Sequence, residues 1–153
     1  MLIAFPPCTY LCKAQIWRLN NDVSRKQAYF MSLDFVKKLW SLPIKYKCIE
    51  NPVGMLSTHW RKPSQIINPN FFGDPYTKEI CLWLDNLPLL HKTKLVPGYK
   101  KVSNHVNSRM SQEQKSKIKS KFFPGIASAM ADQWNSPGDV PSSQQLTLDF
   151  FNL

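Results

Sequence analysis

Hydrophobic and polar positions in the first part of the chain follow two different spacings. Residues 1–5 form a short apolar run that Pro6-Pro7 ends, which predicts a buried strand, because proline cannot donate to a sheet. A helical pattern begins at Ser24–Gln27, a capping box of the form S-x-x-Q, and ends at Pro43. The apolar residues of this amphipathic helix recur at helical spacing: Phe30, Leu33, Val36 and Leu39 or Trp40.

A second apolar run, Tyr46–Ile49, predicts another strand, which ends in the loop Glu50–Gly54. Strand, helix and strand in this order predict a βαβ unit with parallel strands. Ligands of open α/β sheets bind beyond the carboxyl ends of such strands. We therefore expect Cys8, which follows the first strand, and Glu50, which follows the second, to lie on the same rim of the sheet.

Three further segments are expected to form regular structure. Ile80–Leu84 predicts a third strand, whereas residues 56–72 are expected to be irregular. Ser111–Gln114 has the form of a second capping box. Ile126–Trp134 predicts a helix that follows a break at Pro124-Gly125.

The last part of the chain changes in composition. Residues 135–143 are rich in proline, glycine and serine and are expected to form a flexible linker. This composition predicts one domain over residues 1–134, followed by the linker and by a separate tail over residues 144–153.

Charge is concentrated in one stretch of the chain. The 153 residues carry a formal charge of +10, of which nine basic residues and one acidic residue between Lys92 and Lys121 give +8. This excess favours nucleic acid as the partner, with an anionic membrane or a charged small molecule as alternatives. Four lysines are expected to contact the nucleic-acid backbone, unless they form a solvated helix face: Lys115, Lys117, Lys119 and Lys121.

Apolar residues make up 43% of the chain, which is enough for a domain core. No apolar run is long enough to cross a bilayer, and the first residues do not form a signal peptide, so we expect a soluble, cytoplasmic protein without a membrane partner.

The four cysteines indicate whether the chain binds a metal and which thiol could be a nucleophile. No C-x-x-C pair is present and the histidines are dispersed, so the sequence predicts no metal site, and we expect reduced thiols. Cys12, Cys48 and Cys81 are expected to be small buried apolar residues. Cys8 differs, because it directly follows Pro6-Pro7 at the carboxyl end of a strand. There it would be a nucleophile facing the ligand rim, with Glu50 as an acid beside it.

This arrangement resembles the cytosine carbon-5 DNA methyltransferases, and most closely the small phage-type proteins of that class. Their Pro-Cys loop supplies the nucleophile, and their Glu-Asn loop contacts the base. The matching blocks, which extend over residues 1–134, are Pro6-Pro7-Cys8-Thr9-Tyr10-Leu11, Ile49-Glu50-Asn51-Pro52-Val53-Gly54, Arg61-Lys62-Pro63-Ser64-Gln65-Ile66-Ile67, Phe72-Gly73-Asp74-Pro75, Cys81-Leu82-Trp83-Leu84 and Phe123-Pro124-Gly125-Ile126-Ala127.

The resemblance implies a truncated Rossmann-like α/β half-sheet with carboxyl-terminal helices. It also implies that Cys8 adds to carbon 6 of a flipped-out cytosine, that Glu50 protonates or hydrogen-bonds ring nitrogen 3, and that carbon 5 takes a methyl group from S-adenosylmethionine. The further substrate-binding residues that it implies are Pro7, Thr9, Asn51, Arg61 and Lys62. An amino-methyltransferase is the neighbouring alternative, but Phe5 and Cys8 stand where that chemistry uses a polar and an aromatic residue.

The cofactor-binding features of the family are not found. The sequence has five glycines and no Gly-x-Gly turn, and the first three of seven expected strands are absent. The chain would then be half of a split enzyme, a degenerate nucleic-acid-binding remnant or a truncated protein. We expect the apolar edge at residues 1–5 to be covered by a second methyltransferase chain or by another copy of this chain.

The tail carries a separate motif of the form Q-x-x-L-x-F. It resembles the peptide with which bacterial replication and repair proteins bind the sliding clamp, which docks in an extended form. Its contact residues would be Gln145, Leu146, Leu148 and Phe150. The alternative is a tail that packs on the domain. The alternative function for the whole chain is an inactive nucleic-acid- or clamp-binding phage protein with a regulatory or counter-defence role.

Overall fold

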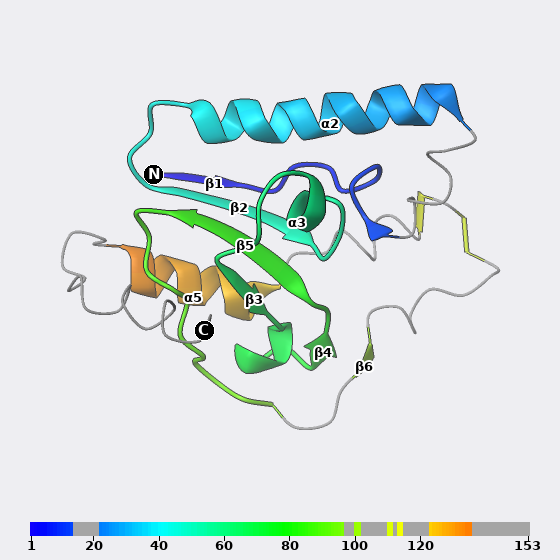
Figure 1. Cartoon of the computed structure of the whole chain (residues 1–153). Helices are drawn as coiled ribbons and strands as arrows, with labels where there is room; N and C mark the ends of the chain where they lie inside the picture. The colour runs from blue at the N-terminus through cyan, green and yellow to red at the C-terminus, as the bar shows by residue number, and fades with distance from the viewer. Residues whose placement is uncertain (14–21, 97–99, 102–109, 112, 115–122, 136–153) are drawn as a thin grey trace, which may run out of the picture.

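The computed structural model describes residues 1–13, 22–96, 100–101, 110–111, 113–114 and 123–135. Their main element is a four-stranded sheet with the strand order β1-β2-β5-β3 (Figure 1). Its strands are β1 (Leu2–Ala4), β2 (Lys47–Pro52), β5 (Ile80–Asp85) and β3 (Gln65–Ile67). The chain is thus a mixed α/β protein with a small mixed sheet.

The strands β1 and β2 are parallel, as the βαβ pattern predicts, with Ile3 opposite Cys48. The strand β5 runs antiparallel to both β2 and β3. A second sheet pairs β4 (Tyr76–Thr77) with β6 (Lys100–Lys101) in parallel. Apolar residues bury β5 on both faces, which is why a continuous apolar run identifies this strand in the sequence.

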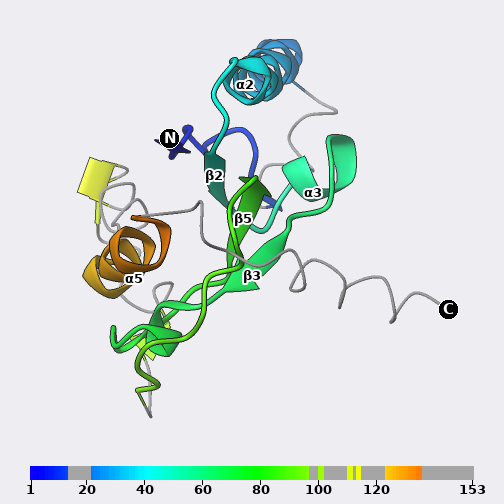
Figure 2. The ribbon, with the colours of Figure 1, turned by 90° about the vertical axis from the view of Figure 1, so that its left-hand side faces the viewer.

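Helices cover both faces of the main sheet (Figure 2). One face carries α2 (Val23–Ser41) and α3 (Leu56–His59), which pack around Ile49 and Trp83. The other face carries α5 (Pro124–Trp134), which packs around Cys48 and Leu82. The core therefore has two layers, separated by β2 and β5.

The N-cap of α2 lies two residues before the predicted cap, Ser24. It is Asp22, whose carboxylate accepts a hydrogen bond from the backbone N–H of Arg25 at 3.1 Å. The hydroxyl of Ser24 instead donates to Asp22, so the prediction of a cap at Ser24 was wrong. Tyr29 is buried in place of Phe30, which is 50% exposed, because adjacent helical positions point about 100° apart.

Three other boundaries differ from the predictions. The segment expected to be irregular contains α3, β3 and the 3₁₀ turn η2 (Pro69–Phe71). The strand β2 continues through Glu50 and Asn51, which were expected in a loop. Pro124 starts α5 rather than breaking the chain before it, because proline fits the first turn of a helix. The capping box at Ser111 and Gln114 is confirmed by two reciprocal hydrogen bonds.

A buried lysine fastens one end of the sheet. Lys47, the first residue of β2, is 8% exposed and forms an ion pair with Asp85 at 2.9 Å. Its Nζ also donates to the carbonyl oxygens of Trp40 and Leu42 at the end of α2. The cation therefore satisfies carbonyl groups that the last helical turn leaves without partners.

Candidate functional site

The candidate nucleophile lies on a tight turn that directly follows β1. Pro6 is buried and Pro7 is exposed, and the carbonyl oxygen of Cys8 accepts hydrogen bonds from the N–H groups of Leu11 (3.0 Å) and Cys12 (3.1 Å). The two prolines end the strand, and these two bonds turn the chain back. The turn leaves the Cys8 side chain half-buried and Thr9 exposed.

Asn51 joins the end of β2 to this turn. Its side chain is 1% exposed, and Nδ2 donates to the carbonyl oxygen of Pro6 at 2.9 Å. The bond joins the end of β2 to the proline segment that follows β1, at the rim of the sheet where a ligand was predicted to bind. Its Oδ1 is buried without a hydrogen-bond partner among the described residues. Asn51 is thus a positioning residue, which holds the Cys8 turn beside the strand that carries Glu50.

Gly54 permits a second link between the same segments. The N–H of Met55 donates to the carbonyl oxygen of Leu11 at 2.7 Å. A Cβ atom on Gly54 would lie 2.2 Å from that oxygen and 3.0 Å from the Cα of Cys12. Only glycine allows the two backbones to approach this closely, so the Pro-Val-Gly end of the Glu-Asn segment has a structural reason.

Burial shifts the pKa values of the two candidate catalytic groups in the same direction. Burial raises the pKa of the Cys8 thiol above its ordinary value, and the nearby Cys12 and Glu50 raise it further. Burial also raises the pKa of the Glu50 carboxyl. Both groups therefore hold their protons to higher pH than exposed side chains of the same type.

Lys78 is a cation of this site that the sequence analysis missed. Its ammonium group lowers the pKa of both Cys8 and Glu50, against the effect of burial. The backbone N–H of Lys78 donates to Oδ1 of Asn68, which holds the segment before β5. No local motif marks this lysine, because only the pairing of β5 with β2 brings it to the carboxyl end of β2.

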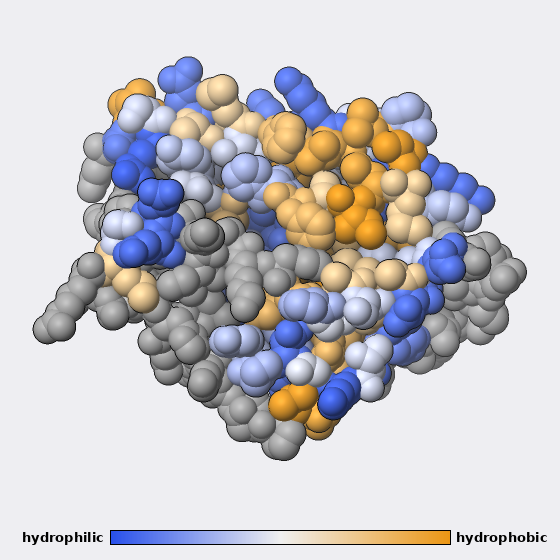
Figure 3. Space-filling view, turned by 180° about the vertical axis from the view of Figure 1, so that it is seen from behind, coloured by the Kyte–Doolittle hydropathy of each residue, from blue (hydrophilic) through white to orange (hydrophobic). Residues whose placement is uncertain are grey.

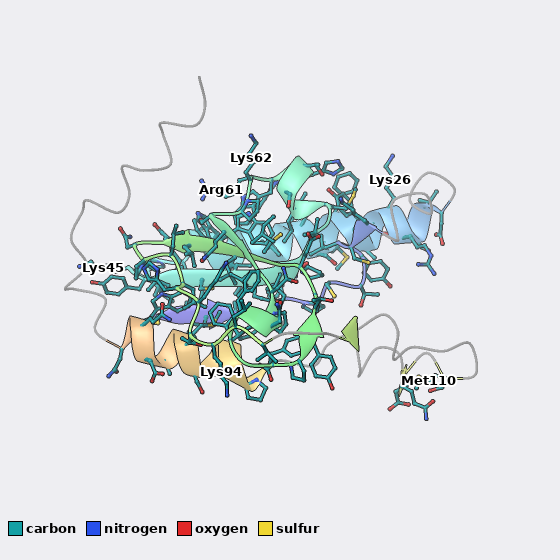
Figure 4. All side chains as sticks on the ribbon, turned by 90° about the horizontal axis from the view of Figure 1, so that it is seen from below. Lys26, Lys45, Arg61, Lys62, Lys94 and Met110 are labelled. Carbon is teal, nitrogen blue, oxygen red and sulfur yellow. The ribbon has the colours of Figure 1, made fainter. Side chains whose placement is uncertain are left out.

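The predicted substrate-binding residues Arg61 and Lys62 lie away from this site. Both are exposed after α3, and their side chains point outward (Figure 4). The guanidinium of Arg61 stacks over Trp40 at 4.8 Å and over Trp60 at 5.4 Å. Trp40 lies beside Lys47 at the amino end of β2, so the structure does not bring Arg61 together with Cys8 and Glu50.

Several predicted residues fall outside the residues that the structure describes. They are the backbone-contacting lysines and the motif of the tail, namely Lys115, Lys117, Lys119, Lys121, Gln145, Leu146, Leu148 and Phe150. Their roles stay predictions. The same holds for the linker beyond residue 135.

Of the remaining cysteines, Cys48 and Cys81 are fully buried as predicted. The prediction that Cys12 is buried was wrong, because its turn leaves it half-buried.

The hollow next to the candidate nucleophile is too small for S-adenosylmethionine. The hollow beside the Cys8 turn has a volume of about 210 Å³ and is lined by Pro7, Met31, Ser32 and Phe35. It is smaller than the cavities that usually hold a ligand of this size. It also offers one hydroxyl group and no carboxylate for a ribose. Within the described part of the chain, no three side chains are placed to hold a metal ion.

Comparison of the chain with protein-family models, curated proteins and solved structures finds no match. In the described ranges, every helix is too short or too polar to cross a membrane. The fold and the site therefore define a mixed α/β protein with a half-buried thiol, a half-buried carboxyl and a lysine at one end of its sheet.

The link through Asn51 can be tested by substitution. Asn51→Ala should lower the free energy of unfolding by about 1–3 kcal/mol, because it leaves the buried carbonyl oxygen of Pro6 without a donor. Urea unfolding followed by circular dichroism measures this change. Lys37→Ala, at an exposed residue on α2, is the control and should cost less than about 0.5 kcal/mol. Equal effects of the two substitutions would contradict the role of Asn51.

Proposed function

We propose that the chain is the base-binding half of a DNA cytosine carbon-5 methyltransferase, in which Cys8 adds covalently to the base. One observation carries this proposal. The hydrogen bond from Asn51 to Pro6 holds a cysteine turn and a glutamate strand side by side at the carboxyl ends of two parallel strands. The electrostatic effect of Glu50 on Cys8 supports their proximity.

The proposed reaction begins with loss of the Cys8 proton to solvent. The thiolate forms a bond to carbon 6 of the cytosine, the double bond between carbons 5 and 6 breaks, and its electron pair moves toward nitrogen 3. Protonated Glu50 gives its proton to nitrogen 3, which leaves a neutral adduct with a nucleophilic carbon 5. The ammonium of Lys78 would stabilise the thiolate before the addition. The described residues supply the groups for the reaction only as far as this adduct.

DNA is the proposed partner because of the charge distribution. The +8 stretch between Lys92 and Lys121 and the exposed Arg61 and Lys62 offer positive charge to phosphates. A cytosine inside a duplex cannot reach Cys8, so the base would enter the site flipped out or from a single strand.

A 5-azacytosine base in a short single-stranded oligonucleotide tests the proposal. This base has nitrogen in place of carbon 5, and after thiolate addition that nitrogen takes a proton from solvent, so trapping needs no methyl donor. We expect a protein–DNA band that survives denaturing electrophoresis, with the modified peptide containing Cys8 in mass spectrometry. Absence of an adduct at saturating DNA would overturn covalent chemistry.

A nucleic-acid-binding protein without catalysis is the second candidate. The raised pKa of Cys8 favours it, because most of the thiol is then protonated at neutral pH, and so does the poor fit to S-adenosylmethionine. This candidate predicts a shifted band in native electrophoresis and none in the denaturing gel.

Glu50→Gln tests whether the reaction needs a protonated carboxyl group at Glu50 in addition to the Cys8 thiolate. Between the pKa values of Glu50 and Cys8, raising the pH creates thiolate as fast as it removes the carboxyl proton. We therefore expect the rate of adduct formation in the wild type to be flat over the interval between these two pKa values. The amide that replaces the carboxyl group in the variant donates its N–H at every pH, so the rate should rise about tenfold per pH unit. Initial rates between about pH 6.5 and 8.5 measure this. A wild-type rate that also rises tenfold per unit would contradict an acid role for Glu50.

A further inference from the structure

Three tryptophans and an arginine form a cluster on the face of the sheet that carries α2 and α3. The rings of Trp40 and Trp60 meet edge to face with centroids 5.3 Å apart, and the ring of Trp60 lies 5.9 Å from that of Trp83. Trp83 is buried, and its Nε1 donates to the carbonyl oxygen of Arg61 at 2.9 Å. The buried indole therefore anchors the backbone of Arg61 beside the two outer rings. We call Trp40, Trp60 and Arg61 the indole platform.

The guanidinium of Arg61 is a positioned cation that still faces solvent. Its central carbon lies 4.8 Å from the ring centre of Trp40 and 5.4 Å from that of Trp60. Arg61 is nevertheless exposed, and among the described residues no carboxylate forms an ion pair with it. The indoles cover one part of the planar group, and its exposed part can stack on another ring or donate its N–H groups.

The chain on either side of the platform residues is basic. Residues 35–49 and 51–73 together contain six lysine and arginine residues and no aspartate or glutamate, which gives a formal charge of +6. Lys47 is paired with Asp85, but the other cations are exposed, namely Arg61, Lys37, Lys38, Lys45 and Lys62. A partner that binds here is therefore expected to be anionic.

The platform and the apolar surface of the molecule lie on different sides. Arg61 and Lys62 project from the side of α3, away from α5 (Figure 4). Figure 3 views the structure from behind and shows apolar side chains gathered along α2 and below it. An anionic partner that also contacts the indoles would therefore bind on the side of α3.

The platform offers two kinds of contact, positive charge and flat rings. A nucleic-acid strand uses both, because each nucleotide joins a phosphate to a base that can stack on an aromatic ring or on an arginine plane. An acidic peptide would use the charge alone. The bases of a duplex already stack on one another, so a base that stacks on the platform has to be unpaired.

We propose that the indole platform binds one unpaired base and the adjoining phosphate of a DNA strand, at a distance from Cys8. This rests on the proposed function only in taking DNA as the partner. The base stacks on the exposed part of the Arg61 guanidinium and extends the stack of Trp40 and Trp60, and Lys62 contacts the phosphate. This second contact holds the strand while a cytosine enters the site at Cys8.

Fluorescence anisotropy with an oligothymidylate of about 12 nucleotides tests the platform. This strand has no cytosine, so its binding does not depend on chemistry at Cys8. Arg61→Gln should weaken binding about tenfold, because the stack and the charge are both lost. Arg61→Lys keeps the charge without the planar group and should recover only part of the affinity. A Arg61→Lys variant that binds like the wild type would contradict stacking.

Lys26→Gln is the matched control for the loss of charge. Lys26 is an exposed cation near the other end of α2 (Figure 4), and its substitution should change the affinity less than about twofold, since salt screens distant charges. Circular dichroism verifies that all variants are folded. Equal losses in Arg61→Gln and Lys26→Gln would overturn the proposal.

An abasic strand of the same length separates stacking from charge. The wild type should bind it about tenfold more weakly than oligothymidylate, and Arg61→Gln should lose most of this difference. Equal affinity of the wild type for both strands would overturn base stacking. Polyglutamate that binds as tightly as oligothymidylate, with the same dependence on Arg61, would show that the surface binds acidic polypeptide instead. At saturating DNA the 5-azacytosine adduct does not require Arg61, so the two proposals can fail separately.

Discussion

Cys8→Ser should abolish the adduct with 5-azacytosine DNA. A serine hydroxyl ionises far less readily than a thiol, so the rate should fall on the order of 10³-fold or more. The measurement is the covalent band on a denaturing gel, followed over time at saturating oligonucleotide. Noncovalent affinity in a native gel should change little, because the substitution exchanges one side-chain atom.

Cys12→Ser is the matched control for this prediction. Cys12 lies on the same turn, is also half-buried, and influences the pKa of Cys8 by its proximity. Its substitution should leave the adduct in place. An adduct that survives in Cys8→Ser, or that disappears only in Cys12→Ser, would show that the nucleophile has been assigned to the wrong thiol.

Gly54→Ala should destabilise the protein by about 2–3 kcal/mol. The new Cβ would lie 2.2 Å from the carbonyl oxygen of Leu11, so one backbone segment has to move and the hydrogen bond from Met55 to that oxygen is lost. Thermal unfolding followed by circular dichroism measures the change. The adduct rate should also fall at temperatures where the variant is folded, since Leu11 belongs to the Cys8 turn.

Gly125→Ala separates stability from site geometry. A Cβ at Gly125 would lie 2.0 Å from the carbonyl oxygen of Phe72, so a similar loss of stability is expected. This contact lies at the start of α5, whose N–H at Gly125 donates to Asp74. At a temperature where both variants are folded, Gly125→Ala should retain the adduct. Equal loss of the adduct in the two variants would contradict a specific role for the Gly54 contact.

The elements that the sequence predicts well are those with a sustained apolar pattern. The strands β2 and β5 and the helix α5 bury most of their apolar side chains, so burial and local preference agree. The strand β1 forms as predicted, but the prediction that it is buried was wrong, because it lies at the edge of the sheet with Leu2 and Ala4 half-buried and Ile3 exposed. The strand β3 has three residues and alternates exposure at Ile66 with burial at Ile67, which gives too short a pattern to recognise. The helix α3, with four residues, is held by its contact with the core through Leu56 rather than by a cap.

The candidate site shows the same limit. Cys8 and Glu50 could be placed together because parallel strands bring their carboxyl ends to one rim. Lys78 could not, since its position depends on the antiparallel pairing of β5 with β2 and no residue near it in sequence marks a site. Arg61 was predicted to bind substrate from the resemblance alone, and this role stays a prediction. In the structure its guanidinium stacks on two indole rings, away from Cys8 and Glu50.

The two ends of the central strands differ in how firmly they are held. At the amino end of β2, Lys47 joins the last turn of α2 to β5 through an ion pair and two carbonyl contacts. At the carboxyl end, the Cys8 turn is held among the described residues by hydrogen bonds from Asn51 and from Met55, and by the buried side chain of Leu11. Opening of the turn would break these contacts, whereas separation of β2 from β5 would break the pairing of two six-residue strands and therefore requires more free energy. Under the proposed function, the flipped-out base would enter the site by a movement of the Cys8 turn while the sheet stays assembled.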